Sequence, residues 1–178
     1  MLTEYGLLSY RPGDYLVVPK CFGHTFVADE DTHLLLIENL CGDFREPDRG
    51  IVGKNAVYDT AQIDVADLAA LQNFLSKNEM NCLEVEVKHS QTITRYQYDE
   101  CIYDVLGWKG DLFPYKLNMD QIMPLMSHRA HLPPSAHTTF VAPNFVVCSF
   151  VPRPLESDAD ALKWIRYFTF LSPTEIES

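Results

Sequence analysis

The sequence lacks the features that mark a membrane protein, a secreted protein or a nucleic-acid-binding protein. No apolar run reaches the roughly 18 residues of a transmembrane span, and the N-terminus has no basic stretch followed by an apolar core that would predict a signal peptide. No Lys/Arg cluster stands out, and 25 acidic residues against 14 basic ones give a formal net charge of −11. This charge argues against a nucleic-acid or anionic-membrane partner. We therefore predict a cytoplasmic protein with no nucleic-acid and no membrane partner.

The sequence also has few cysteines, and none of them forms a CxxC pair. The five are scattered along the chain: Cys21, Cys41, Cys82, Cys101 and Cys148. An odd number of scattered cysteines is typical of a reducing compartment rather than of a disulfide framework or a zinc site. We therefore expect reduced, buried thiols.

Short apolar runs separated by Pro, Gly and Asp dominate the chain and predict a mainly β fold, either a sandwich or a barrel. The runs that predict strands are residues 5–10, 15–19, 24–28, 33–40 and 83–98, with a hairpin over 138–154 that turns at 142–144. Leu83, Val85 and Val87 alternate with charged residues, which is the period-two pattern of a half-buried strand.

One clear helical stretch interrupts the strands. Residues 65–77 carry apolar side chains at three- and four-residue spacing, whereas residues 41–64 show little periodicity and are expected to form an ordered loop. A second short helix, capped by Ser157, is expected over residues 158–166. Two strand-rich blocks thus flank a loop and a helix, which suggests a duplicated barrel divided into residues 1–64, 65–80 and 81–178.

A metal-site motif occurs near the N-terminus. Gly13, Pro19 and His24 follow the spacing G-x5-P-x4-H, the second half of the cupin barrel signature, with Cys21 where the usual motif has a second glycine. A cupin metal site also needs an upstream HxH and a glutamate, but upstream of Gly13 the chain has no histidine and one acid, Glu4. Stable sites need about three protein ligands. We therefore interpret His24 as a strand-end histidine with a hydrogen-bond partner.

Six stretches, in this order along the chain, resemble the homogentisate 1,2-dioxygenase family of the cupin superfamily: residues 3–26, 34–40, 50–64, 103–124, 129–140 and 145–157. The block W-x-G-x-x-x-P-Y-K, which begins at Trp108, is the most specific of the matching motifs. The resemblance covers roughly residues 1–160 and fits the helix poorly. It implies a cupin-like fold of bicupin type, with two joined barrel halves that are both incomplete here, the first without metal and the second with iron.

The resemblance also implies an Fe(II) site of two histidines and one carboxylate, which leaves positions open for O2 and substrate. Aligned on Tyr167 and Phe168, Thr169 stands where the family has its first histidine, and Glu175 falls near the expected glutamate. No later segment supplies the second histidine. We therefore assign no metal ligand, expect no Fe(II) to be bound by this chain alone, and expect an internal piece or a protein shortened at both ends.

One functional residue of the family has a counterpart here. His131 matches an H-x-x-P-S motif whose histidine acts in the family as a base on the substrate phenol, and an ordinary imidazole pKa of about 6.5 suits that role. Trp108, Tyr115 and His137 are candidates for the substrate pocket, although such aromatics are more often core residues and His137 can equally be a hairpin residue bonded to backbone.

Two functions remain open on these grounds. The first is a ring-opening dioxygenase of tyrosine and phenylalanine catabolism that is inactive as this isolated chain. The second is a non-catalytic cupin remnant that acts as a structural module or binds a small aromatic acid. Incomplete barrels leave strand edges unpaired, and unpaired edges promote association, so we also expect a homo-oligomer.

Overall fold

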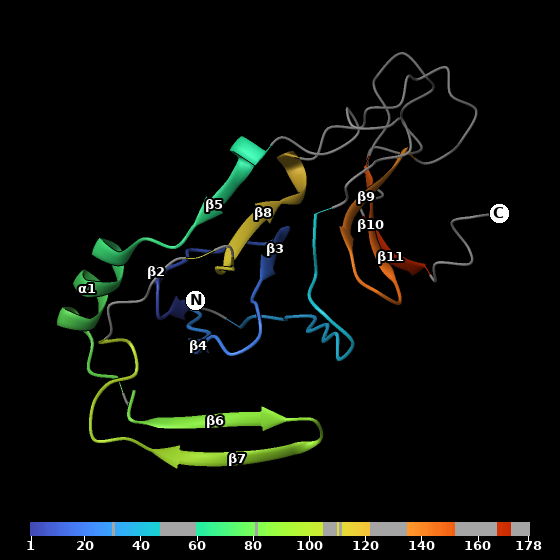
Figure 1. Ribbon diagram of the computed structural model, residues 1–178. Coiled ribbons are helices and arrows are strands. Elements are labelled where there is room, and N and C mark those ends of the chain that lie inside the picture. Colours follow the sequence, from blue (N-terminus) through green and yellow to red (C-terminus); the bar gives the residue numbers. More distant parts are fainter. Residues whose placement is uncertain are drawn as a thin grey trace. The chain divides into compact units, whose positions relative to one another are not determined.

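The computed structural model (Figure 1) describes residues 1–29, 31–46, 60–80, 82–104, 110, 112–121, 135–151 and 167–171. Within these residues the chain is mainly β, with antiparallel sheets and a single α-helix, as a cupin-like fold requires. It divides into two compact units: residues 1–40 with 63–117, and residues 41–62 with 118–178. No described helix has the length and apolar character needed to cross a membrane.

Two three-stranded sheets form most of the first unit. The first has the order β2-β1-β4 and is made of β1 (Leu2–Thr3), β2 (Gly6–Leu7) and β4 (His24–Thr25). The second has the order β3-β8-β5 and is made of β3 (Asp14–Val17), β8 (Tyr115–Asn118), whose last residue belongs to the second unit, and β5 (Ile63–Val65). A 3-10 turn precedes β5 at Thr60–Gln62, and another follows β8 at Met119–Gln121. The strand predicted over 15–19 is confirmed but begins one residue earlier and ends two residues earlier, and the strand predicted over 24–28 is confirmed for its first two residues.

The helix α1 (Leu68–Lys77) begins three residues later than the sequence pattern indicates. Asp67 caps it, because one carboxylate oxygen accepts the amide protons of Ala69 and Ala70 at 2.9 and 3.2 Å. The backbone of Asp67 also exchanges hydrogen bonds with Leu7 at 2.8 and 2.9 Å, which ties the start of the helix to β2. Val65, counted with the helix in the sequence, instead ends β5.

Two apolar clusters form the core of the first unit. One contains Met1, Leu8 and Ala66, and the other contains Leu2, Leu71 and Tyr103. Met1, which directly precedes β1, and Leu2, the first residue of β1, therefore point to opposite sides, as the alternation of a strand requires. Leu71 is the fully buried residue of α1 and connects the helix to the second cluster.

The prediction of a strand at residues 33–40 is wrong. The structure gives these residues no strand, and it leaves Leu35 and Leu36 64% and 74% exposed. An unbroken leucine run carries no alternation that would choose one buried face, so it does not fix a pairing register.

The β6–β7 hairpin lies in the first unit and consists of β6 (Glu84–His89) and β7 (Thr92–Gln97) (Figure 1). The two strands are antiparallel, with Glu84 opposite Gln97 and His89 opposite Thr92. The strands were predicted, but the expected half-burial of β6 is wrong: only Val85 of its six side chains is partly buried.

The prediction of reduced, buried thiols is also wrong for four of the cysteines. Cys82 and Cys101 form a disulfide with a Cα–Cα distance of 4.9 Å, while Cys21 and Cys41 are free but exposed. The hairpin explains the pairing, because it returns the chain on itself and brings residues 19 apart in sequence to the same end. The side chain of Cys148 lies outside the described residues.

The second unit contains a sheet of order β9-β10-β11, built from β9 (Ser135–Val141), β10 (Val146–Val151) and β11 (Tyr167–Leu171). The predicted hairpin with its turn at 142–144 is confirmed, and Ala142 donates to the carbonyl of Phe145 at 2.9 Å. The register shifts between Val147 and Cys148, and the buried hydroxyls of Thr139 and Ser149 hydrogen-bond there at 2.6 Å. The helix predicted over 158–166 lies outside the described residues.

Candidate functional site

The predicted site residues fall in different parts of the chain. His131 and Trp108 lie outside the described residues. His137 lies in β9, where its Cα pairs with that of Ser149, and its side chain is not described. Tyr115 begins β8, is half-buried, and has its ring 6.1 Å from that of Phe113 in an edge-on arrangement. Their roles in a substrate pocket therefore stay predictions.

The opening motif forms a tight turn that leads into β3. The Asp14 carboxylate accepts the Arg11 amide proton at 2.9 Å, and the Asp14 amide donates to the Arg11 carbonyl at 3.1 Å. Gly13 between them has φ 90°, a conformation that glycine adopts without steric cost. Cys21, at the position of the motif's second glycine, also has a positive φ of 65°. The chain therefore keeps the backbone shape of that glycine while carrying a side chain there.

His24 lies where the motif would place a metal ligand. It is exposed, and its Nδ1 lies 3.1 Å from the carbonyl oxygen of Phe22. Because a carbonyl oxygen can only accept, Nδ1 is the donor in this hydrogen bond. The ring also contacts Phe26 edge-on at 5.5 Å. His24 is thus a strand-end histidine with a hydrogen-bond partner, as the sequence indicates.

Glu4, the single acid upstream of the motif, is also engaged with backbone. Its Oε1 accepts the amide proton of Gly23 at 2.7 Å, immediately before His24. A Cβ at Gly23 would stand 3.0 Å from the same oxygen, so glycine makes room for this contact. In the described part of the chain, no group of three or more His, Cys, Asp and Glu side chains could hold a metal ion.

A buried tyrosine lies next to this strand. The Tyr103 hydroxyl and the Thr25 hydroxyl are 2.5 Å apart, and Tyr103 belongs to the second apolar cluster. Burial raises the pKa of Tyr103, the hydrogen bond from Thr25 lowers it, and the charge of Glu4 raises it further. Tyr103 is therefore held as a neutral phenol that locks β4 to the core.

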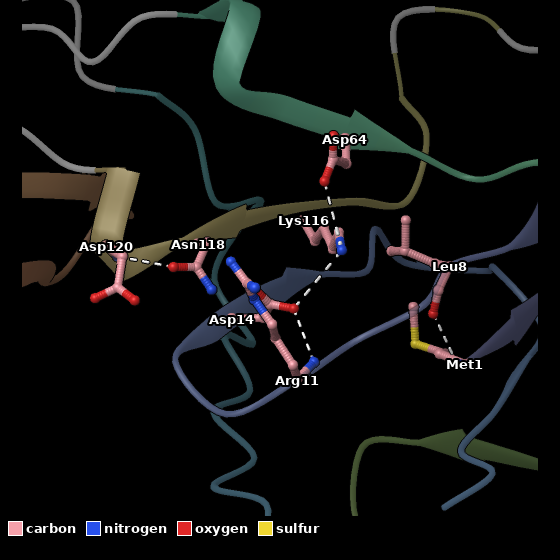
Figure 2. Close-up of polar contacts among 8 residues, drawn as sticks. All are labelled: Met1, Leu8, Arg11, Asp14, Asp64, Lys116, Asn118 and Asp120. Atoms are coloured by element: carbon pink, nitrogen blue, oxygen red, sulfur yellow. Dashed lines mark hydrogen bonds and ion pairs between the residues drawn. The ribbon is translucent and has the colours of Figure 1, made fainter.

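A lysine connects the three strands of the second sheet, and sequence reasoning missed it. The Nζ of Lys116 on β8 lies 3.8 Å from a carboxylate oxygen of Asp14 on β3 and 3.4 Å from one of Asp64 on β5 (Figure 2). The side chain of Asp14 is 2% exposed, that of Lys116 17% and that of Asp64 64%. Lys116 ends the W-x-G-x-x-x-P-Y-K block and Asp14 ends the RPGD turn, so the two motifs meet in one ion cluster.

A cleft of about 1060 Å³ lies beside α1. Its apolar part is formed by Leu71, Leu75 and Met80 together with the Cys82–Cys101 disulfide. Of the predicted site residues, Tyr115 has a described side chain and does not line the cleft, and the charged residues around it come from the helix end and from Asp104. The described lining of the cleft is therefore mainly apolar.

Comparison with known proteins identifies the family. The model of the family described as "Homogentisate 1,2-dioxygenase N-terminal" matches residues 1–119, which include both motifs of the ion cluster. The chain is 27% identical over 178 residues to a protein of Saccharolobus solfataricus that carries the provisional name dioxygenase, a match that covers 98% of this chain and 44% of that protein.

Two relatives named homogentisate 1,2-dioxygenase match less of the chain. One, from Rhodopseudomonas palustris, is 26% identical over 148 residues, and one from Drosophila melanogaster is 22% identical over 143 residues. These matches cover 81% and 80% of this chain but 31% of each relative. The chain thus spans less than half the length of the curated relatives that it matches, and no solved structure matches it. From the family match over residues 1–119, the chain belongs to the homogentisate 1,2-dioxygenase family.

Proposed function

We propose that this chain is part of the machinery of an Fe(II)- and O2-dependent dioxygenase that opens the aromatic ring of homogentisate or a similar dihydroxyphenyl acid, in tyrosine and phenylalanine catabolism. The observation that supports this most is the family match over residues 1–119. The division into a metal-free first half over 1–64, a helix and linker over 65–80, and the start of a second half over 81–178 is part of the same proposal.

The described residues do not supply an iron site. No three His, Cys, Asp or Glu side chains among them could hold a metal, and Glu4 and His24 are both bonded to backbone. We therefore assign no step of the reaction to iron in this part of the chain. Iron, where the family binds it, activates O2 and holds the substrate's oxygens.

His131 is the residue of this chain to which we assign chemistry. As a neutral imidazole it accepts the phenol proton of the substrate and then stabilises the ring anion by a charge-assisted hydrogen bond. Trp108, Tyr115 and His137 are proposed to line the pocket for the ring. The ring contact of Tyr115 with Phe113 and its half-burial suit such a lining.

A second candidate function is a non-catalytic cupin remnant that binds a small aromatic acid or acts structurally. The hydrogen bonds of Glu4 to the Gly23 amide and of His24 to the Phe22 carbonyl support a structural role for these two side chains, and they fit the metal-free half of the first candidate equally well. In either case we propose a cytoplasmic homo-oligomer.

Homogentisate binding and its dependence on His131 separate the two candidates, and iron content with oxygen uptake tests whether this chain is itself the enzyme. The purified 178-residue chain is loaded anaerobically with Fe(II), and metal content and oxygen consumption with homogentisate are measured. We expect iron well below one per chain and no uptake above the buffer rate; stoichiometric iron with ring cleavage would mean that this chain is itself the enzyme. Homogentisate binding is then measured by calorimetry for wild type, for His131→Gln and for the control His89→Gln. The base assignment requires that only His131→Gln weakens binding, and that this loss shrinks below about pH 6, where the imidazole is protonated.

A further inference from the structure

The β6–β7 hairpin is a two-stranded ribbon with little to stabilise it. Among the described residues, β6 and β7 pair only with each other, so no described strand pairs with the outer edge of either (Figure 1). Val85, Val87 and Tyr96 share one face, and Val87 and Tyr96 are 42% and 48% exposed. An isolated hairpin is marginally stable in water, and a third strand is usually needed. The alternation of apolar and charged residues in β6 predicts that its apolar face is buried against another segment. No described residue buries that face.

The outer edge of β6 can be assigned residue by residue. Tyr98 donates to the carbonyl of Leu83 at 2.8 Å, so this pair points its backbone groups inward. In an antiparallel ladder, hydrogen-bonded and non-hydrogen-bonded pairs alternate. Val85, Val87 and His89 therefore also point inward, and the amides and carbonyls of Glu84, Glu86 and Lys88 point toward the outer edge.

These three outward residues are complementary to themselves in one antiparallel register. With Val87 opposite Val87 of a second copy, Glu86 of each copy faces Lys88 of the other, and both form hydrogen-bonded pairs. Moving the register by one step places Glu86 opposite Glu86, beside two Glu84–Lys88 pairs, or in the other direction Lys88 opposite Lys88, so only the register centred on Val87 pairs opposite charges without a like-charged pair. Like charges placed opposite each other destabilise a sheet, whereas opposite charges stabilise it. Charge therefore selects the register centred on Val87.

The outer edge of β7 offers no such complementarity. Its outward residues are Ile93, Arg95 and Gln97, of which only Arg95 is charged. A symmetric pairing of this edge either places two arginines opposite each other or pairs no opposite charges. The β6 edge is thus the one built to meet a second copy of the same chain.

We propose that two copies of this chain associate through the outer edges of β6, antiparallel about a two-fold axis at Val87, to form a continuous four-stranded sheet. Val85, Val87 and Tyr96 of both copies then line one shared apolar face. Glu86 and Lys88 keep their exposed contacts with Arg95 and Glu38 of their own copy. This inference rests on the proposed homo-oligomer and names the surface that forms it.

Charge reversal tests the register. In Glu86→Lys and in Lys88→Glu, like charges face each other twice across the interface, and we expect sedimentation velocity to show a dissociation constant raised by about tenfold or more. In the double variant Glu86→Lys/Lys88→Glu the opposite charges are restored, and association should return to within about threefold of wild type. If only the contacts within one copy mattered, the double variant would instead associate more weakly than either single variant, because it puts a lysine beside Arg95 and a glutamate beside Glu38. Glu100→Lys, also exposed, is the matched control and should associate like wild type.

Cross-linking tests the axis independently of charge. Val87→Cys is made in a Cys21→Ser/Cys41→Ser background, and a mild oxidant should give a covalent dimer, because the two introduced thiols are opposite each other at the axis. Ile93→Cys on the β7 edge and the background alone should give none. A dimeric wild type that is insensitive to all three charge variants, or a double variant weaker than both single ones, would overturn the β6 interface while leaving the oligomer intact. A wild type that stays monomeric at every concentration would overturn both, without touching the proposed role of His131, which homogentisate binding tests.

Discussion

Loss of the Cys82–Cys101 disulfide should destabilise the first unit by about 3 kcal/mol. The bond joins residues 19 apart in sequence, and the loss of chain entropy for a loop of that length corresponds to about 3 kcal/mol at 25 °C. The closed loop contains the whole β6–β7 hairpin, and both cysteines pack against the cluster of Leu2, Leu71 and Tyr103. The bond therefore holds the base of the hairpin to the core.

Hydrogen exchange read by mass spectrometry measures this effect locally. Reduction of the wild type, which keeps both sulfur atoms, should speed exchange of the amides in residues 82–104 by about a hundredfold, as 3 kcal/mol predicts when exchange follows unfolding. Amides of residues 135–151 belong to the second unit and serve as the internal control. Cys82→Ala/Cys101→Ala should exchange at the reduced rate and no longer respond to reductant.

The matched control removes the two exposed free thiols. Cys21→Ala/Cys41→Ala should respond to reductant as fully as the wild type does, because neither residue takes part in the bond. An unchanged exchange rate in residues 82–104 after complete reduction, verified by alkylation of Cys82 and Cys101, would refute the reasoning. It would show that packing alone holds the hairpin base.

Three further predictions concern single groups. Cys21→Gly should raise the free energy of unfolding, measured by urea titration, by about 0.5–1 kcal/mol. The left-handed conformation costs a residue with a side chain about 1–2 kcal/mol, and glycine gives back about half of that gain in conformational entropy. Unchanged or lower stability would contradict this prediction. Lys116→Met should lower the free energy of unfolding by about 1–3 kcal/mol, since it leaves the nearly buried Asp14 carboxylate without its cation. Asp64→Asn, on the exposed side of the cluster, should lower it by less than about 1 kcal/mol, and equal losses would refute the assignment. Burial lowers the pKa of the Met1 α-amine from 8.0 to about 6, so between these values the unfolded chain binds more protons, and the free energy of unfolding should rise from pH 6 to pH 8. N-terminal acetylation should remove that part of the rise, and an identical pH profile after acetylation would count against the prediction.

Local chemistry was readable from the sequence where one residue decides the outcome. The RPGD turn, the turn at 142–144 and the period of α1 all follow from residues within a few positions of one another. The start of α1 was missed because Val65 fits both a helical period and a strand, and only its pairing with Tyr115 on β8 decides between them. Propensity cannot resolve such a case, because the partner lies 50 positions away in the sequence.

Contacts between distant segments were not readable. Counting cysteines predicted reduced thiols, but the pairing of Cys82 with Cys101 depends on the hairpin that returns the chain. The sequence draws attention to the aromatic residues of the W-x-G-x-x-x-P-Y-K block rather than to Lys116, whose ion pairs with the acids on β3 and β5 form only in the folded sheet. The signal that could have found it is the combination of an acid that closes a tight turn with a lone lysine between the apolar residues Tyr115 and Leu117.

The strands around the opening motif are joined by contacts between their own side chains and backbone. A bound ion would join side chains from several strands, and in the described residues hydrogen bonds and ion pairs do so. Here Glu4 bonds the amide of Gly23, which fixes β4 beside β1. Lys116 joins β3, β8 and β5 by charge, and Tyr103 holds Thr25 from the core side. The positive φ of Cys21 follows from the same constraint: the turn is determined by the strands on either side of it, so the backbone has a conformation typical of glycine although the residue is cysteine.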